Sequence, residues 1–302
     1  MVIKKKLTDS NYNSVLLSYP KIYDLLSGKN VNRVEKLNSR WRASNLLLRI
    51  DCDDLSYVFK QVNVNNPKSE MEKIALLKKE SPLLFPELFI FENNAYLMEY
   101  VVGQSFFDLD SKERVSKVSF AGKVLSQTHR LNDFPLVDIR EDIGESFKKY
   151  RTKAEKFFLK KELQSFNFEM FCAVPSQLSH NDLNAANLIY GNNIKLIDPK
   201  EETFNDVAKD VGRYCASCFF NNYDYFGNEK KKSLELAEAF LSNFDNNLLN
   251  RARYFMGESF LSFLNFDTHS DSKGVLKKLA MNLLLSKGKG DLVNLLEEGL
   301  NE

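Results

Sequence analysis

The chain has 302 residues, of which 43% are hydrophobic and 27% are charged, and its formal net charge is +1. These values are ordinary for globular proteins and exclude a wholly disordered chain. The near balance of positive and negative side chains excludes nucleic-acid binding through a strongly basic face, so any recognition of phosphate has to be local. The length is sufficient for one large domain or for two lobes, each with its own core.

The sequence contains no membrane span, because its longest apolar segments are interrupted by charges and none approaches about 18 residues. The basic residues near the N-terminus are not followed by an apolar run of signal-peptide length. We therefore expect a cytoplasmic protein, and the sequence carries no indication of its oligomeric state.

Four cysteines, Cys52, Cys172, Cys215 and Cys218, are too few and too scattered for a disulfide scaffold. Cys215 and Cys218 form a C-x-x-C pair, a spacing that also occurs in redox and zinc sites. The sequence around this pair is typical of an apolar helix, no second close pair exists, and the chain has three histidines. Buried structural thiols are therefore the favoured interpretation.

Residues 8–27 carry an amphipathic pattern of apolar side chains every three or four positions, which predicts a helical extension at the N-terminus. Pro20 is expected to break or kink this helix, and Gly28 to end it. Residues 31–63 then contain three short segments rich in β-branched and aliphatic side chains: VNRVEKL, NLLLRID and SYVFKQV. Polar turns separate these segments, as expected for a meander of strands.

A further helix is predicted over residues 69–80 from the spacing of its apolar side chains. Residues 88–101 then predict a β-hairpin, in which LFIFE and AYLMEYV are the strands and Asn93-Asn94 is the turn.

Most segments beyond residue 111 have the three-to-four spacing of amphipathic helices. Five such helices are predicted, within residues 112–131, 141–158, 231–244, 250–266 and 274–287. Residues 178–200 are the exception, since two apolar segments, ANLIY and IKLID, flank a Gly-Asn-Asn turn and predict a hairpin. The sequence therefore predicts an α+β protein with two lobes. The strand-rich lobe covers residues 1–101, with the helical extension at about 8–27, and the larger helical lobe covers residues 102–302.

The segment around this second hairpin contains His180-Asn181-Asp182, then Asn187, and finally Asp198. Phosphoryl transfer requires a carboxylate that orients the acceptor hydroxyl and accepts its proton, together with hard oxygen ligands that hold Mg²⁺ against the nucleotide. Asp182 suits the first task, and Asn187 and Asp198 suit the second. The hairpin returns Asp198 to the loop that carries Asn187, so their separation in the sequence is no obstacle.

The pattern H-x-D-x-x-x-x-N, with an apolar hairpin that leads to I-D, resembles the catalytic signature of the protein-kinase-like superfamily. H-N-D at residues 180–182 stands where most protein kinases have H-R-D, and D-P-K at residues 198–200 stands where they have D-F-G. This version resembles the branch of aminoglycoside phosphotransferases and choline/ethanolamine kinases. The motif N-D-L-x-x-x-N-L-I-Y is similar to that of choline and ethanolamine kinases, whereas I-D-P-K is more similar to that of streptomycin and fructosamine kinases. The resemblance covers roughly residues 35–215.

The resemblance implies a bilobal protein-kinase-like fold, with the catalytic loop and the acceptor site in the helical lobe. It also implies a reaction, the transfer of a phosphoryl group from ATP or GTP, with Mg²⁺, to a hydroxyl of an aminoglycoside-, choline- or sugar-like small molecule. Asp182 would be the catalytic residue, and Asn187 and Asp198 the metal ligands. Asp210 resembles the buried aspartate that braces the catalytic loop, which is a structural role.

The same resemblance implies a nucleotide site. Lys60, on the predicted third strand, would pair with the α- and β-phosphates. Glu70, or alternatively Glu72, would hold that lysine from the following helix. The backbone carbonyl of Glu99 and the backbone amide of Val101 would meet the adenine edge at the hinge between the lobes.

The phosphate-binding loop should lie at residues 38–45, which contain no glycine. Glycine normally lets backbone amides approach phosphate closely, so this loop departs from the family pattern. Ser44 and Asn45 match the small polar pair common in aminoglycoside kinases, and Arg40 and Arg42 could supply charge instead. The departure keeps an alternative open, a catalytically inactive nucleotide-binding or scaffold protein.

Two other interpretations are less favoured. His180 could act as a general base, but in kinase-like loops this histidine usually packs and hydrogen-bonds. The chain could be a protein kinase, but it has no A-P-E-like segment. In addition, only a short stretch separates Asp198 from the predicted helix that contains Asp210, which leaves little room for an activation segment.

The acceptor is left open by the sequence. A cationic aminoglycoside would favour carboxylates in the helical lobe, for which the candidates are Asp224, Glu235, Glu258, Asp267 and Asp271. Choline would favour an aromatic cage, for which the candidates are Tyr223, Tyr225, Phe226, Tyr254, Phe255 and Phe260. The favoured interpretation of both sets is solvated surface acids and ordinary aromatic residues of helix cores.

Overall fold

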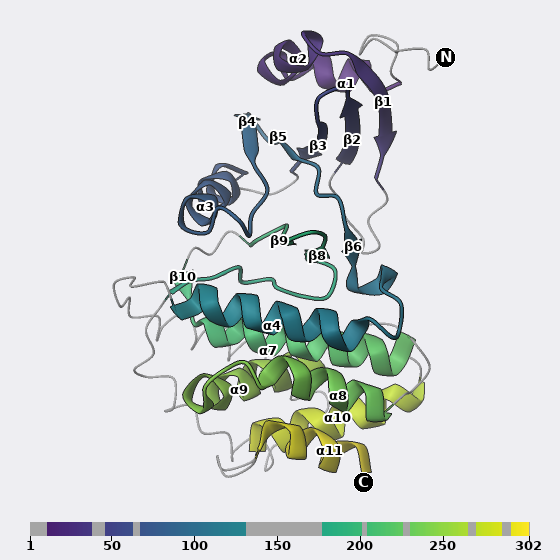
Figure 1. Ribbon diagram of the computed structural model, residues 1–302, viewed down its shortest axis with the longest axis vertical. Helices are drawn as coiled ribbons and strands as arrows, with labels where there is room; N and C mark the ends of the chain where they lie inside the picture. The colour runs from purple at the N-terminus through teal and green to yellow at the C-terminus, as the bar shows by residue number, and fades with distance from the viewer. Residues whose placement is uncertain are drawn as a thin grey trace. The chain divides into compact units, whose positions relative to one another are not determined.

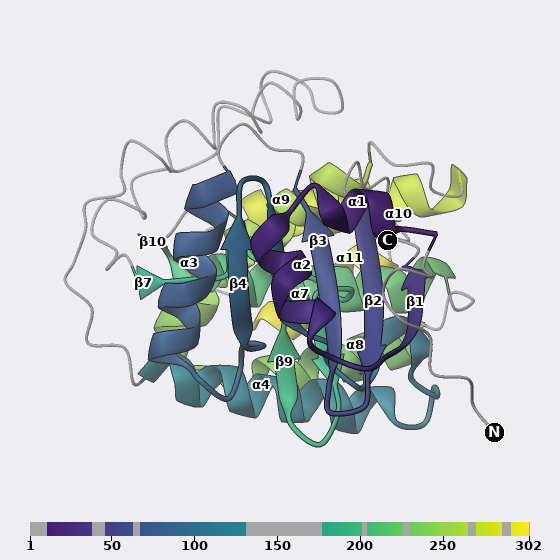
Figure 2. The same ribbon diagram turned by 90° about the horizontal axis from the view of Figure 1, so that it is seen from above.

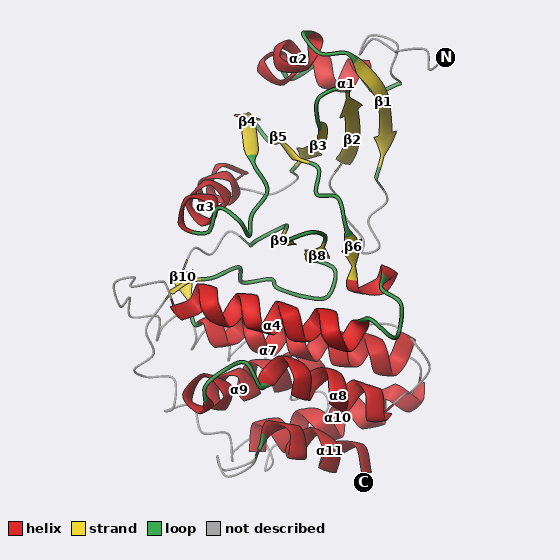
Figure 3. Cartoon of the chain, viewed as in Figure 1, coloured by secondary structure: helices red, strands yellow, loops and turns green. Residues whose placement is uncertain are grey.

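The structure is a computed structural model that describes residues 11–37, 46–62, 67–130, 177–200, 204–225, 230–264, 270–285 and 291–301. The chain divides into two compact units. The first unit consists of Met1–Gly103 with Gly191–Glu201, and the second of Gln104–Tyr190 with Glu202–Glu302. Figures 1 and 3 show that strands dominate the first unit and helices the second. The predicted helix over residues 141–158 and Cys172 lie outside the described residues.

The first unit contains a five-stranded antiparallel sheet with the order β1-β2-β3-β5-β4. Its strands are β1 (Val31–Lys36), β2 (Leu46–Cys52), β3 (Ser56–Gln61), β4 (Leu88–Glu92) and β5 (Ala95–Glu99). All five strands were predicted from the sequence. Asn93, in the turn between β4 and β5, has a φ angle of 55°, a left-handed conformation that asparagine tolerates better than most residues.

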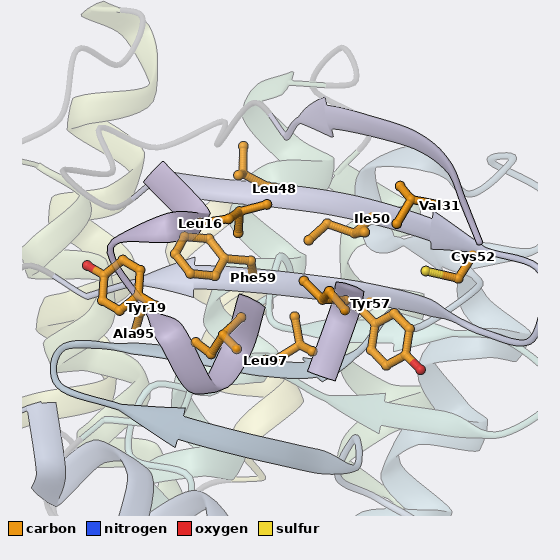
Figure 4. Packing of buried hydrophobic residues seen from close by; sticks show 12 residues of the cluster. Leu16, Tyr19, Val31, Leu48, Ile50, Cys52, Tyr57, Phe59, Ala95 and Leu97 are labelled. Carbon is orange, nitrogen blue, oxygen red and sulfur yellow. The ribbon is translucent and has the colours of Figure 1, made fainter. Parts of the chain in front are cut away.

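Two short helices, α1 (Asn13–Leu17) and α2 (Pro20–Ser27), cover one face of this sheet. Leu16 and Ile22 of the helices pack with Phe59 and other apolar residues of β2, β3 and β5. Figure 4 shows Leu16 beside Phe59. Pro20 is the first residue of α2, so the expected break in the N-terminal extension is confirmed. The Glu92 carboxylate accepts the backbone N–H of Lys21 at 2.9 Å, a favourable contact at the positive end of α2.

The opposite face of the sheet carries the alternate side chains of the same strands, because successive residues of a strand point to opposite faces. Val58, Tyr96 and Met98 pack there against Met71 and Ile74, which belong to α3 (Pro67–Glu80). Figure 2 shows α3 alongside β4, and α2 across the sheet. Since Lys60 follows Val58 by two positions, it lies on the face that packs against α3.

The second unit is built mainly of helices, together with short strands. Its helices are α4 (Arg114–Arg130), α7 (Val207–Phe220), α8 (Lys230–Leu241), α9 (Asn246–Phe263), α10 (Ser270–Leu285) and α11 (Leu292–Asn301). α4 packs against α8, α7 against α8 and α9, and α10 against α9 and α11, so the helices form successive layers (Figure 1). The helices predicted within residues 112–131, 231–244, 250–266 and 274–287 are confirmed, whereas α11 was not predicted. Among the described residues, no helix is long and apolar enough to cross a membrane.

The close approach of α7 and α9 depends on Gly212. A Cβ atom at this position would lie 2.9 Å from the backbone nitrogen of Met256, closer than real Cβ contacts. Any larger residue would therefore push the two helices apart, and with them the loop that α7 holds.

Short elements flank residues 179–187, the segment that contains Asp182 and Asn187. β7 (Gln177–Leu178) pairs with β10 (Phe204–Asn205), and β6 (Gln104–Ser105), which is followed by the 3₁₀ helix η2 (Phe106–Asp108), pairs with β8 (Leu188–Tyr190). A π-helical turn, η4 (Asn221–Tyr225), extends α7. β9 (Ile194–Leu196) belongs to the first unit, where the Leu196 N–H donates to the Leu84 carbonyl at 2.7 Å.

Candidate active site

Asp210 holds the loop that contains the predicted catalytic residue. It lies in the first turn of α7, is almost completely buried, and accepts the backbone N–H groups of His180 at 2.6 Å and Asn181 at 2.8 Å. Hydrogen bonds to an ionised carboxylate are among the strongest in proteins. The bracing role predicted for Asp210 is therefore confirmed.

The loop turns sharply at Asn181, whose φ angle is 64°. This left-handed conformation is easiest for glycine, and asparagine is among the residues that adopt it at lower cost than most. Asparagine can therefore occupy position 181 with less strain than most residues other than glycine. His180 is buried, and its Nδ1 accepts the N–H of Asp182 at 3.3 Å, as expected for a residue that packs and hydrogen-bonds.

Asp182 has 25% of its side chain exposed, and its Oδ1 lies 2.8 Å from Nη2 of Arg213. Arg213 also donates from Nη1 to the backbone carbonyl of Asn181 at 3.0 Å. The sequence reasoning missed this arginine. The available signal was its place three residues after Asp210, which is about one helical turn.

Asn187 is tied to the same loop, because its Nδ2 donates to the backbone carbonyl of Asp182 at 2.9 Å. The Nδ2 of Asn184 donates to the same carbonyl at 3.0 Å. The bond at Nδ2 fixes the orientation of the Asn187 amide group, whose oxygen is the atom that a metal ion would need.

The first unit brings together two of the predicted residues. Lys60, on β3, is 5% exposed, and its Nζ forms an ion pair with the carboxylate of Asp198. The Lys60 ammonium also lies 5.6 Å from the centre of the Tyr96 ring. Asp198 has 54% of its side chain exposed and a φ angle of 60°, so the chain adopts a left-handed conformation at the predicted metal ligand.

The predicted hinge residues lie at the end of β5. Glu99 is the last residue of this strand, and its N–H donates to the Glu87 carbonyl at 2.8 Å. In an extended strand the N–H and C=O of one residue point to the same side, so the carbonyl of Glu99 is also turned away from β3. Val101 follows in the connection that leads to Gly103.

The other predicted nucleotide contacts are not described. Glu70 belongs to α3, but its side chain lies outside the described residues, as do Ser44 and Asn45. The residues that the structure does describe fit Mg²⁺ in their chemistry, since the amide of Asn187 and the carboxylate of Asp198 supply hard oxygen donors. Neither residue belongs to a cluster of three or more His, Cys, Asp or Glu side chains, because no such cluster occurs among the described residues.

The C-x-x-C pair is structural, as predicted. Cys215 and Cys218 are buried, unpaired thiols on α7. Burial raises the pKa of Cys218 to about 12 and that of Cys215 well above its usual range. Since the thiolate is the reactive form, neither residue is suited to redox or metal chemistry in the folded protein.

Most of the described candidates for acceptor binding are surface acids or aromatic residues of helix cores. Tyr254, Phe255 and Phe260 of α9 are buried in the helix packing, and Glu235 is an exposed surface acid. Glu258 is buried on α9. Tyr223 is buried as well, whereas no side chain is described for Asp224, Tyr225, Phe226, Asp267 and Asp271.

No family model and no curated protein matches the sequence. Solved structures do match. An ethanolamine kinase from Plasmodium vivax has a TM-score of 0.53 and 15% identity, with 97% of this chain and 88% of that chain covered. The choline kinase LicA from Streptococcus pneumoniae has a TM-score of 0.52 and 17% identity, with 97% and 93% covered. A protein from Thermobifida fusca, provisionally assigned as a fructosamine-3-kinase, has a TM-score of 0.54 and 12% identity, with 94% and 98% covered.

These similarities extend over nearly the whole chain. The protein therefore has the α+β, protein-kinase-like fold that is found in small-molecule kinases, and the predicted fold class is confirmed. At these identities the similarity establishes the fold, and the function has to be argued from the site.

Proposed function

We propose that this protein is an ATP- and Mg²⁺-dependent phosphotransferase that acts on a hydroxyl group of a small molecule. The observation that carries the proposal is the binding of both the His180 and Asn181 N–H groups by the buried Asp210 carboxylate. This arrangement anchors the loop that carries Asp182 to helix α7, and a fixed position is what a residue that orients a hydroxyl group requires.

In the proposed reaction, Asp182 accepts the proton of the acceptor hydroxyl while the hydroxyl oxygen forms a bond to the γ-phosphorus. The bond between that phosphorus and the bridging oxygen breaks, and ADP leaves. ATP would supply the phosphoryl group, and a bound Mg²⁺ would neutralise charge on its phosphates. Asn187 and Asp198 are the proposed ligands of the metal ion.

The first unit would bind the nucleotide. Lys60 would contact the α- and β-phosphates, and the backbone carbonyl of Glu99 and amide of Val101 would meet the adenine. We further propose Glu70 as the partner of Lys60 in the nucleotide-bound state. Ser44 and Asn45 are proposed as phosphate contacts, and GTP is the alternative donor. On this assignment, residues 1–101 form the nucleotide lobe and residues 102–302 the lobe with the catalytic loop and the acceptor site.

The acceptor classes follow from the resemblance and from the names of the structural neighbours, an ethanolamine kinase, a choline kinase and a provisional fructosamine-3-kinase. Aminoglycosides are a further acceptor class, which follows from the resemblance alone. A coupled assay of ADP release would screen aminoglycosides, choline, ethanolamine, fructosamines and simple sugars, with ATP and with GTP. Activity that requires both Mg²⁺ and Asp182 supports the proposal.

The second candidate is a catalytically inactive nucleotide-binding or scaffold protein. The observation that favours it is the absence of glycine from residues 38–45, where backbone amides would have to approach phosphate. Failure of every acceptor in the screen, together with no nucleotide-dependent change in Tm, would favour this candidate and overturn the proposed activity.

A further inference from the structure

Helix α7 contacts the catalytic loop through two residues of opposite charge. Asp210 accepts two N–H groups of the loop, and Arg213, one turn later, donates to the Asn181 carbonyl at 3.0 Å and lies 2.8 Å from Asp182 Oδ1. The two ends of the guanidinium group thus bind the backbone and the side chain of adjacent residues. This pair of contacts restricts both the position of the loop and the rotamer of Asp182.

The contribution of this ion pair to folding stability should be small. The Arg213 and Asp182 side chains are 22% and 25% exposed, so water screens their attraction, and exposed pairs of this kind contribute little to stability. The ion pair should have a larger effect on the orientation of the Asp182 carboxylate. The guanidinium group is a rigid planar fork with several donors, so two contacts from it define direction better than a single ammonium group could.

The charge of Arg213 also has a consequence for the proposed reaction. A carboxylate that approaches a phosphoryl group repels it, because both are negative. A guanidinium group beside Asp182 reduces this repulsion. It takes no part itself in the making or breaking of bonds.

We propose that Arg213 is a positioning residue for phosphoryl transfer, which directs the Asp182 carboxylate toward the acceptor hydroxyl and balances its charge. This inference rests on the proposed function. It assigns no contact between Arg213 and the substrate, so its effect on the reaction should pass through the position and charge of Asp182.

The test compares two arginines of the same unit. Arg213→Met removes the guanidinium group but keeps a long apolar side chain, and Arg213→Lys keeps the charge without the fork. Arg251→Met is the matched control, since Arg251 Nε lies 2.8 Å from Asp206 Oδ2 and its side chain is 20% exposed. We expect Arg213→Met to lower kcat by about 10- to 100-fold with less than about a twofold change in KM for ATP. Arg213→Lys should be intermediate, and Arg251→Met should keep the wild-type kcat even if its Tm falls further.

A double-mutant cycle separates positioning from a general structural effect. If Arg213 acts through Asp182, Arg213→Met should lower the residual rate of Asp182→Asn by less than about twofold. A multiplicative loss in that background would overturn the inference, as would a wild-type kcat in Arg213→Met.

The outcomes also distinguish the two levels of proposal. An active wild type, a strongly impaired Asp182→Asn and a fully active Arg213→Met would leave the proposed function standing and overturn the role of Arg213. A wild type that releases no ADP with any acceptor would overturn the proposed function, and the role of Arg213 with it.

Discussion

Lys60 of β3 and Asp198 form an ion pair within the first unit, although 138 residues separate them in the sequence. The pair exists because residues 191–201 return to this unit, where Lys195 donates to the Phe85 carbonyl at 3.1 Å. The lysine proposed for the phosphates and the carboxylate proposed for the metal ion are therefore in contact with one another. Each compensates the charge of the other.

Asp198→Asn should abolish the Mg²⁺-dependent part of nucleotide binding, because an amide is a much weaker magnesium ligand than a carboxylate. For the wild type, nucleotide at about 100 times its Kd should add about 2.7 kcal/mol to the free energy of unfolding, a readily measured rise in Tm. Asp54→Asn is the matched control, since Asp54 also pairs with a lysine of the first unit, Lys29, and is 55% exposed. A full Mg²⁺-dependent rise in Asp198→Asn would place the metal site elsewhere.

Asp182→Asn should remove phosphoryl transfer while nucleotide binding remains. The substituted amide keeps the shape of the side chain and can still accept a hydrogen bond from Arg213, but it cannot take the proton of a hydroxyl group. We expect kcat to fall by about 10²–10⁴-fold, measured as ADP release with an acceptor identified in the screen. The rise in Tm with ATP and Mg²⁺ should be within about a degree of the wild-type value. Turnover at the wild-type rate would exclude Asp182 as the proton acceptor.

Asp210→Ala should be strongly destabilising. The carboxylate is buried and accepts two backbone N–H groups, and hydrogen bonds to charged groups contribute about 1.5–3 kcal/mol each. The substitution would leave both N–H groups without this acceptor, so the free energy of unfolding should fall by about 3 kcal/mol or more. Urea unfolding measures this loss, and a decrease below about 1 kcal/mol would show that the loop does not depend on Asp210.

Asn181→Gly should preserve both stability and activity, because the loop is held through the backbone N–H and C=O of this residue. Asn181→Ala should be less stable than Asn181→Gly by about 1 kcal/mol, since alanine adopts a φ angle of 64° only with strain. Thermal unfolding of the two variants provides the comparison. Equal Tm values would indicate that the left-handed conformation does not limit the choice of residue.

Much of the fold follows from local patterns. The alternation of apolar residues in β2, β3 and β5 determines which side chains face α1 and α2, and Pro20 marks the break between those helices. The last helix, α11, was missed although its leucines are periodic, because the segment is short and follows a glycine- and lysine-rich stretch.

In the candidate site, too, local sequence patterns indicate some residues, whereas tertiary contacts bring in others. Asp182, Asn187 and Asp198 could be proposed from the sequence because they lie along one short segment with the spacing that the resemblance implies. The contact between Arg213 and Asp182 is tertiary, since it depends on which side of α7 meets the loop, and one sequence does not contain that information. The pairing of Lys60 with Asp198 depends on how residues 191–201 return to the first unit, which is equally non-local.

The buried thiols of α7 predict a loss of stability at alkaline pH. In the unfolded chain a cysteine titrates near pH 9, whereas burial raises the pKa of Cys218 to about 12 in the folded protein. Below pH 9 both states hold the proton, so stability does not depend on this group. Between pH 9 and 12 only the folded state holds it, and the free energy of unfolding should fall by up to about 1.4 kcal/mol per pH unit.

Burial also raises the pKa of Cys215, Tyr190 and Tyr214, so these groups lower the free energy of unfolding at alkaline pH in the same way. The hydroxyl groups of Tyr190 and Tyr214 are hydrogen-bonded to each other. Comparison with Cys218→Ala measures the contribution of Cys218 alone to this pH dependence. Urea unfolding at several pH values from 8 to 11 should give a slope against pH that is shallower for Cys218→Ala by up to about 1.4 kcal/mol per pH unit above pH 9.5. Parallel slopes for the variant and the wild type would mean that the Cys218 thiol is accessible to water in the folded protein.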